Sequence, residues 1–446
     1  MTLFQRITSL LITALLWAMP AHAVPPIQEQ KLDNGLRILL MEAHNVPMVS
    51  MQLSIAGGSR FDPSNKGGTA MLLAAMLADH TARHDHEALA ELLDAEAIQL
   101  GAGASREGVN LSLTVLKEVL PNGIDALSEA LLDPGWNKAR FKLIKENAIS
   151  AAQKAQEEPG TRAAQASVEL LFGDHPYGHP AGGTLTTLKN IKLADLQRLY
   201  RAQLKPESAV LAVSGDITMR ELTDLLEPAL KPWRGSPEKG LFDIEKAKAP
   251  QGQIRTIEMP TTQTLAQLVR LGPARKDADF FPTFVLNHLL GGGGFGSRLM
   301  EEVREKRGLV YGVYSYFIPL TTQGPFIITL QTRANQATEA EGVVRNVLQE
   351  MFDGMITKKQ LKETKANLIG SFAQRMDSNR ERVGLMGMIG FYQMPLDYLQ
   401  VWTEKVESVT LANVQDAAKA YMNPETWNLV QVGPRLMMEV PKEGDK

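Results

Sequence analysis

Cysteine is absent from the 446-residue chain, so no disulfide bond can form in it and the fold must be held by its hydrophobic cores. Aromatic residues make up only 6% of the sequence. Acidic residues outnumber basic ones by three, 50 against 47, and no run of basic residues occurs. This weak negative balance gives no indication of a nucleic-acid partner.

Long hydrophobic runs are also missing. The longest, Ile7–Met19, has 13 residues, fewer than the ~20 that a membrane-spanning helix needs. Arg6 precedes this run and Ala21-His22-Ala23 follows it, a pattern that predicts a cleaved signal peptide over residues 1–23. Its removal takes away one base and no acid, so the formal charge moves from -3 to -4. We therefore expect an exported protein of the periplasm without a membrane span.

The length of the chain predicts more than one domain, because about 420 mature residues exceed what one hydrophobic core usually serves. Residues 231–253, KPWRGSPEKGLFDIEKAKAPQGQ, are rich in proline, glycine and charge and lack an apolar period. We place a linker at 233–253, between an N-terminal domain at 24–232 and a C-terminal domain at 254–446.

Hydrophobic periodicity predicts an α+β fold. Alternating patterns predict strands within Gln28–Met41, Val49–Ile55 and Val109–Val115. Apolar residues recur at helical spacing in five further segments, and these predicted helices do not alternate regularly with strands. The predicted helices are Thr69–Ala78, Glu87–Ala97, Pro121–Leu132, Asn137–Gln156 and Ser297–Arg307.

The two halves of the chain look related. Aligning Leu188–Gly215 with Val406–Gly433, a shift of 218 positions (406 minus 188), superposes eight identical residues without a gap. Each segment reads as a helix, a Pro-Glu turn and an apolar strand. A repeat of about 200 residues indicates a duplicated domain, since solenoid units have periods of roughly 20–50.

The stretch Leu32–Leu77, LDNGLRILLMEAHNVPMVSMQLSIAGGSRFDPSNKGGTAMLLAAML, resembles the opening of the pitrilysin, insulinase and mitochondrial processing peptidase superfamily of zinc peptidases, the inverzincins. This resemblance implies two homologous domains, each an antiparallel-rich sheet covered by helices, that face each other across a chamber. The family motif H-x-x-E-H places two zinc-binding histidines on one face of a helix, with a glutamate that activates water.

The resemblance places no catalytic group at the motif positions of this chain. Met71 and Ala75 stand at the histidine positions and Ala74 at the glutamate position. Ala151, within the similar stretch Phe141–Pro159, stands at the position of the third ligand. These side chains cannot hold Zn²⁺, and unaided water is a poor nucleophile at neutral pH. We expect no metal or other cofactor in this chain and no peptide hydrolysis by it alone.

Histidines elsewhere leave two alternatives open. His80, His84 and His86 could form a substitute metal site, or they could belong to an exposed polar turn, which we favour. His175 and His179 resemble a structural loop of the family. No cysteine and no G-x-S-x-G stretch supports a nucleophilic triad.

The second half keeps more of the family pattern. Gly291, Gly292, Gly293 and Gly294 lead into the predicted helix, without the Gly-Lys-Ser/Thr of a nucleotide loop. We interpret them as a loop with positive-φ turns, with a peptide-contacting role as the alternative. Arg304 and Tyr311 match a family pair that holds the substrate carbonyl and the oxyanion. By residue type alone, they could equally be a solvated helix charge and a half-buried strand aromatic.

These observations predict the zinc-less subunit of a heterodimeric periplasmic metallopeptidase, in which Arg304 and Tyr311 complete the site of a zinc-bearing partner. A second hypothesis is a stand-alone peptide-binding or scaffold protein, and a third is a hydrolase that uses the three clustered histidines. The Met-rich stretch Leu385–Met394 is typical of adaptable core or interface packing. Substrate, partner and homo- or hetero-oligomeric state stay open.

Overall fold

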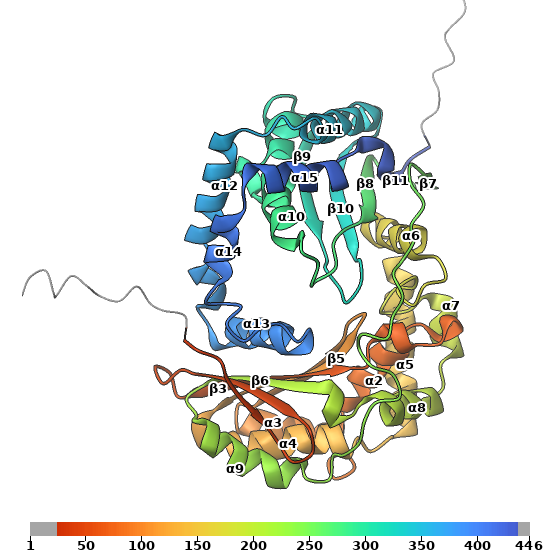
Figure 1. Cartoon of the computed structure of the whole chain (residues 1–446). Coiled ribbons are helices and arrows are strands. Elements are labelled where there is room, and N and C mark those ends of the chain that lie inside the picture. Colours follow the sequence, from red (N-terminus) through yellow and green to blue (C-terminus); the bar gives the residue numbers. More distant parts are fainter. Residues whose placement is uncertain (1–24, 436–446) are drawn as a thin grey trace, which may run out of the picture.

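The computed structural model describes residues 25–435, which form two mixed α/β halves, each built on its own sheet (Figure 1). The predicted signal peptide, residues 1–23, lies outside the described residues. Among the residues described, none of the helices has the length and apolar character needed to cross a bilayer.

The N-terminal sheet has six strands in the order β1-β2-β6-β3-β5-β4. All neighbours are antiparallel except the β2–β6 pair. The strands are β1 Gln28–Lys31, β2 Arg37–Glu42, β3 Met48–Ala56, β4 Gln99–Ala104, β5 Gly108–Leu116 and β6 Ala209–Gly215.

The C-terminal sheet has five strands in the order β7-β11-β8-β10-β9, again with one parallel pair, β7–β11. The strands are β7 Ile254–Glu258, β8 Gln263–Leu271, β9 Val310–Phe317, β10 Pro325–Arg333 and β11 Asn428–Gly433. Without β1, the N-terminal sheet has the same order, which confirms that the two halves are homologous.

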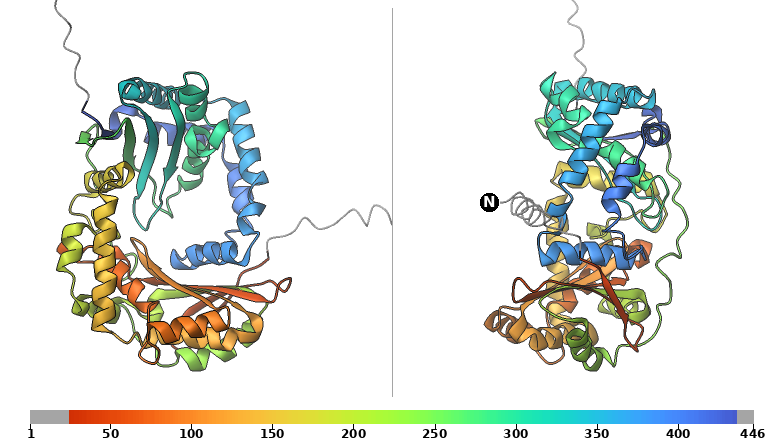
Figure 2. Two further views of the ribbon diagram at one scale, coloured as in Figure 1. Left: turned by 180° about the vertical axis from the view of Figure 1, so that it is seen from behind. Right: turned by 60° about the vertical axis from the view of Figure 1, so that its left-hand side comes forward.

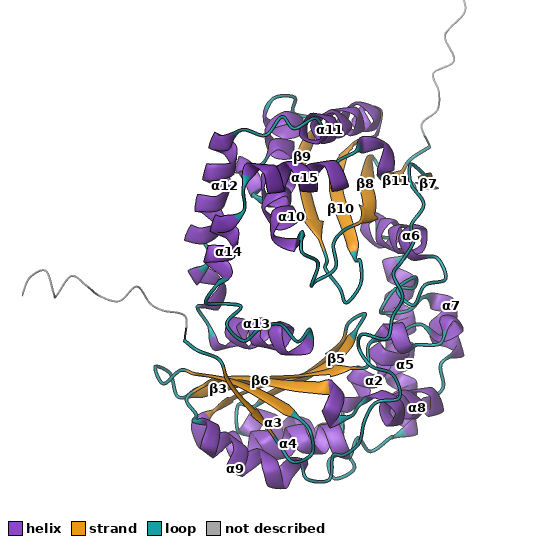
Figure 3. Ribbon diagram, viewed as in Figure 1, coloured by secondary structure: helices purple, strands orange, loops and turns teal. Residues whose placement is uncertain are grey.

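Helices cover both sheets (Figure 3). In the first half they are α2 Thr69–Leu77, α3 His86–Ala95, α4 Leu120–Leu132, α5 Lys138–Ala155, α6 Pro159–Phe172, α7 Leu185–Asn190, α8 Leu193–Gln203 and α9 Met219–Leu230. In the second half they are α10 Phe280–Asn287, α11 Ala337–Phe352, α12 Lys358–Gly370, α13 Asn379–Phe391, α14 Trp402–Ser408 and α15 Leu411–Tyr421.

The predicted repeat holds at the level of single residues. A shift of 218 carries α8 Leu193–Gln203 onto α15 Leu411–Tyr421, and it carries the 3-10 turn Pro206–Ser208 onto Pro424–Thr426. The other predicted helices of the first half agree with the structure within two residues. Strand β4, QLGAGA, was not predicted, because glycine and alanine carry no alternating apolar pattern.

The two halves exchange one helix each. Helix α13 of the second half packs on β3 and β6 of the first sheet, while α6 of the first half packs on β8 and β11 of the second. The two helices occupy corresponding places in the repeat, since Pro159 shifted by 218 falls at position 377, two residues before α13. Residues 231–253 contain no helix or strand and run along one side of the molecule (Figure 2).

Close packing fixes α13 on its sheet. A Cβ atom on Gly390 would lie 2.5 Å from Cγ2 of Val210, so no larger residue fits there without a shift. Met386 and Ile389 are buried in the same core as Leu39 and Val210. The Met-rich stretch therefore packs between the halves, as its composition predicts. The domain boundaries at 232 and 254 stay a prediction, and the spatial halves trade segments that such boundaries ignore.

A buried carboxylate joins the halves at the turn between β4 and β5. Glu107 accepts hydrogen bonds from the hydroxyls of Tyr177 and Tyr392, the latter at 2.7 Å, and from the backbone N–H of Thr321 at 3.0 Å. Tyr392 and Thr321 belong to the second half. Burial raises the pKa of Tyr177 and of Tyr392, so both hydroxyls stay protonated and can donate.

We predict that Glu107→Ala lowers the free energy of unfolding by about 3 kcal/mol, because three donors, among them the buried hydroxyl of Tyr177, then lose their acceptor. Chemical denaturation of the mature chain measures this. Glu118→Ala, at an exposed position, is the matched control and should change stability by less than about 0.5 kcal/mol. Equal losses of stability in the two variants would contradict the role of Glu107 in linking the two halves.

Candidate functional site

Helix α2 carries the sequence that resembles the zinc motif. Six of its side chains belong to the hydrophobic core of the first half, and alanine, leucine and methionine are strong helix formers. They are Ala70, Leu72, Leu73, Ala74, Met76 and Leu77. Packing alone therefore accounts for the helix.

The four motif positions offer no metal ligand. Met71 and Ala75 are partly exposed on α2, Ala74 is buried, and Ala151 is exposed on α5, which packs against α2. Within residues 25–435, no group of three or more histidine, cysteine, aspartate or glutamate side chains could hold a metal ion. The residues present do not fit zinc.

Each of the three clustered histidines contacts a nearby residue, and His80 and His86 share Asp79. His80 is buried, its Nδ1 lies 3.0 Å from Oδ2 of Asp79, and its Nε2 accepts the backbone N–H of Asn137 at 3.2 Å. The expectation of an exposed turn is therefore wrong for His80, which is a structural residue. Helix α2 ends at Leu77, so the spacing of His80 and His84 is not a helical one.

The other histidines also bond locally. His84 Nδ1 lies 3.0 Å from Oε2 of Glu129, and His86 Nδ1 lies 3.1 Å from the carbonyl oxygen of Asp79. His175 Nε2 lies 3.0 Å from the carbonyl oxygen of Glu245, and His179 Nδ1 lies 3.3 Å from that of Pro180. These contacts hold loops in place.

The glycine-rich segment differs from the expected loop. His288–Gly292 forms a wide π-helical turn, and of the four consecutive glycines only Gly294 has a positive φ, +61°. Close approach explains the others. A Cβ on Gly291 would lie 2.6 Å from the backbone nitrogen of Ser315, and one on Gly293 would lie 2.7 Å from the carbonyl oxygen of His288.

The predicted helix Ser297–Arg307 is likewise wrong in its details. Helical hydrogen bonding begins at residue 298, and Met300–Glu305 forms a π-helix that brings Lys306 N–H to the carbonyl oxygen of Glu301 at 2.9 Å. Such wide turns are rare in proteins overall, and those that occur often lie at functional sites. This geometry sets the direction of Arg304 on the last turn.

The structure brings Arg304 and Tyr311 together, with the guanidinium against the tyrosine ring. The guanidinium of Arg304 lies 5.4 Å from the ring centre of Tyr311 and 4.7 Å from that of Phe295, so it stands between two aromatic rings. Tyr311 is 90% exposed and Phe295 is 72% exposed. The π faces attract the cation, and Arg304 also makes an ion pair through its Nε with Oε1 of Glu305 at 3.6 Å.

A β-bulge determines the direction in which the side chain of Tyr311 points. Val310 pairs with Thr332 and Val313 with Leu330, so β9 has one more residue than β10 between these pairs. Tyr311 and Tyr314, three apart, are therefore both exposed, together with Tyr316. The pairing of Tyr314 with Thr329, and of Thr329 with Gln267, puts these tyrosines on the sheet face that α6 partly covers.

The corresponding face of the first sheet is polar on β3 and β5, whereas its β2 and β6 part is apolar and packs against α13. The polar residues that share the face of Gln52 on β3 and β5 are Ser50, Ser54, Asn110, Ser112 and Thr114. Sequence reasoning missed Phe295 as a neighbour of Arg304, and it missed the shared exposure of Tyr314 and Tyr316. The spacing Y-x-x-Y-x-Y gives no single-face pattern unless a bulge is assumed.

Comparison with known proteins agrees with this architecture. A family model described as "Insulinase (Peptidase family M16)" matches residues 37–184, and one described as "Peptidase M16 inactive domain" matches residues 190–368. The chain belongs to peptidase family M16. The resemblance on which the zinc positions were assigned is therefore confirmed.

Relatives of this M16 chain span nearly its full length. The protein named non-peptidase homolog YmxG of Helicobacter pylori is 26% identical over 92% of this chain and 95% of its own. An uncharacterized zinc protease of Streptomyces coelicolor is 24% identical over 93% of this chain and 91% of its own.

A solved structure shares both fold and sequence with this chain. The peptidase M16 inactive domain from Pseudomonas fluorescens is 32% identical, superposes with a TM-score of 0.86, and covers 92% of this chain and 98% of its own. A protease from Helicobacter pylori superposes with a TM-score of 0.85 at 18% identity, which shows a common fold.

We predict that the helix pair α2 and α5 still has the family geometry. The triple variant M71H/A75H/A151E should then bind about one zinc ion per chain, because histidines four apart share one helix face. Atomic emission after dialysis measures the metal. M71H/A75H/Q153E, with the acid two residues further along α5, should bind at least about tenfold more weakly. Equal binding by both variants would contradict the geometry.

A second prediction concerns Asp62, which caps α2. Its carboxyl accepts the N–H groups of Gly68 at 2.8 Å and Ala70 at 3.0 Å, and burial nevertheless raises its pKa from 3.8 to about 7. Between these values the folded chain holds a proton that the unfolded chain releases. The contribution of Asp62 to stability is therefore full below about pH 4 and is lost as pH rises to about 7.

Relative to Asp62→Asn, the wild-type chain should lose up to about 4 kcal/mol of unfolding free energy across that window. Urea unfolding of both proteins at about pH 4 to pH 7 tests this, with the difference between them isolating Asp62 from other groups. A difference that stays constant with pH would refute it.

Proposed function

We propose that this M16 chain is the zinc-less subunit of a two-chain periplasmic metallopeptidase. Arg304 and Tyr311 would complete the active site of a zinc-bearing partner of similar size. The observation that supports this most directly is the contrast between the two halves. The first half has lost all four zinc-site groups, whereas the second holds the Arg304–Tyr311 pair with a π-turn, a bulge and a flanking ring.

The chemistry of the pair suits action on another chain's substrate. Arginine keeps its charge at physiological pH and presents several donors in one plane, and tyrosine donates from a stiff ring. Both could hold a peptide carbonyl and the oxyanion that forms at it. Tyr311 is 90% exposed with respect to residues 25–435, so a second molecule can reach its side chain.

The names given to two relatives support the loss of peptidase activity in this chain. The Helicobacter relative is called a non-peptidase homolog, and the Pseudomonas structure is called an inactive domain. The heterodimer and the periplasmic location rest on the sequence, through the vacant motif and the predicted signal peptide. Zinc would be carried by the partner.

We expect the mature chain to raise the peptidase rate of a zinc-bearing M16 partner. Arg304→Ala or Tyr311→Phe should then lower kcat/KM of the mixture about 10²- to 10³-fold, since each removes a donor from a preorganised site. Arg307→Ala and Tyr314→Phe are matched controls from the same turn and strand, and they should stay within about threefold of wild type. Steady-state cleavage of a fluorogenic peptide measures the rates.

If the mixture cleaves no faster than the partner alone, or if the controls fall as far as the two test variants, the proposal fails. Capture of unfolded peptide by the lone chain, unchanged by the partner, would support the stand-alone peptide-binding function instead. Activity of the lone chain with bound zinc would support a hydrolase built on the clustered histidines.

A further inference from the structure

A hollow of about 530 Å³ lies beside Tyr311 of the Arg304–Tyr311 pair, between strands β9 and β10. Thr329, Gln331 and Arg333 of β10 line it from one face, because alternate residues of a strand point to the same side. Among the described residues that line this β9–β10 hollow, none is an aspartate or a glutamate. The guanidinium of Arg333 is therefore its one charged group.

Arg333 lies close to the pair through the register of the two strands. Thr332 pairs with Val310, so Arg333 and Tyr311 each directly follow one member of a cross-strand pair. Diagonal neighbours on one sheet face are about 7–8 Å apart, which a long side chain can span. Arg333 is exposed, and within residues 25–435 its side chain makes no ion pair and no hydrogen bond. Its charge is free to meet a molecule held at Tyr311.

A second hollow, of about 470 Å³, lies on the polar face of the first sheet. Gln52, Ser112 and Thr114 line this β3–β5 hollow, and Arg380 of α13 reaches it from the side. Again, none of the described lining residues is an acid, and Arg380 is the one charged group. Arg380 is exposed and, like Arg333, has no acid partner among residues 25–435.

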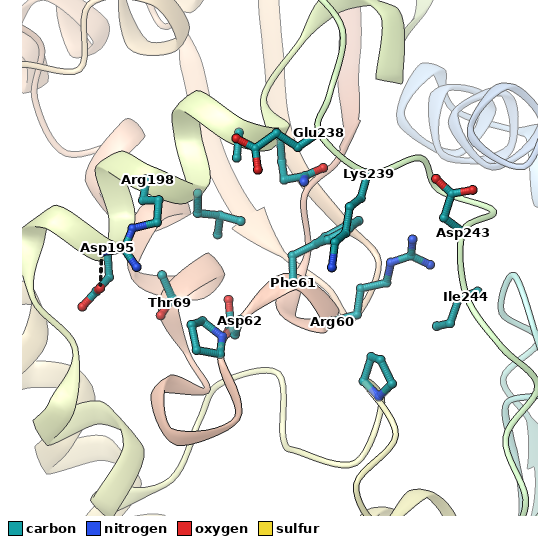
Figure 4. Close-up of a pocket in the computed structure, with 15 residues that line it drawn as sticks. Arg60, Phe61, Asp62, Thr69, Asp195, Arg198, Glu238, Lys239, Asp243 and Ile244 are labelled. Carbon is teal, nitrogen blue, oxygen red and sulfur yellow. Dashed lines mark ion pairs between the residues drawn. The ribbon is translucent and has the colours of Figure 1, made fainter.

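This charge pattern is not general to the hollows of the chain. A hollow of about 400 Å³ between α8 and the connecting segment carries both signs, with Asp195 and Glu238 beside Arg198 and Lys239 (Figure 4). Arg198 and Asp195 pair there at 3.5 Å. Positive charge without a balancing acid is thus a feature of the two hollows on the sheet faces.

The chemistry of these two hollows favours one class of peptide side chain. A guanidinium without an acid partner can bind a carboxylate through two parallel hydrogen bonds, whereas a lysine or arginine of the substrate would meet a like charge. Resting on the proposed function, we propose that this subunit selects peptide substrates rich in acidic side chains and disfavours basic ones. Arg333 and Arg380 are the specificity-determining residues.

Cleavage by the mixture of the mature chain and a zinc-bearing M16 partner tests this. The probes are short fluorogenic peptides, acetylated and amidated, in which leucine alternates with glutamate, glutamine or lysine. We expect kcat/KM for the glutamate peptide to exceed that for the lysine peptide at least about tenfold, with the glutamine peptide between them.

Charge reversal assigns this preference to the two arginines. Arg333→Glu and Arg380→Glu should each lower the glutamate-to-lysine ratio about fivefold, and the two together should reverse the preference. Arg220→Glu, at an exposed position of α9 outside both hollows, is the matched control and should keep the ratio within about twofold of wild type. A ratio of two rates cancels any general loss of activity in a variant.

Equal rates for the glutamate and lysine peptides overturn the inference, as does a ratio that Arg333→Glu and Arg380→Glu leave unchanged or that Arg220→Glu moves as far. In each of these cases the mixture still cleaves faster than the partner alone, so the proposed function stands. If the chain accelerates the cleavage of none of the peptides, the proposed function fails and this inference fails with it.

Discussion

Each sheet of this M16 chain needs a helix that the other half supplies. Leu39, Met41, Val210 and Ala212 on the first sheet share a core with α13 of the second half. Ala163 and Ala166 of α6 share a core with Val269 and Val430 of the second sheet. Apolar area removed from water is the dominant favourable term in folding, so neither half is a complete folding unit without the other.

This exchange limits how the halves can move. A separation that pulled α6 and α13 from their sheets would expose two cores, so any opening must leave both helices seated. Glu107 adds a second link between the halves, because its carboxylate accepts hydrogen bonds from donors in both of them. The relative placement of the inner sheet faces, one polar and one with tyrosines, is thereby fixed by packing rather than by the connecting segment.

Helix α2 folds without zinc-binding side chains at the positions of the family motif. Helix α2 keeps its place because its buried leucines and methionine fill the first core, and that requirement does not involve Met71, Ala75 or Ala151. On the other side of the molecule, Arg304 and Tyr311 lie on surface that packing does not need. Exposed groups of this kind are available to a molecule outside the chain.

Sequence reasoning reached the features that depend on local pattern. The amphipathic helices, the repeat through α8 and α15, and the empty motif on α2 follow from spacing within short windows. Features that depend on register or on distant contacts were not accessible. The β9 bulge that turns Tyr311 outward and the burial of Glu107 arise only when strands and halves come together.

The helix exchange also bears on the origin of a two-domain chain from a single repeat unit. A single unit of the repeat would carry a helix that its own sheet does not receive and a sheet face that its own helix does not cover. Two copies would satisfy each other reciprocally, as in a swapped dimer with two-fold symmetry. Joining the copies through a stretch such as 231–253 turns that association into an intramolecular one, with the effective concentration that a tether provides.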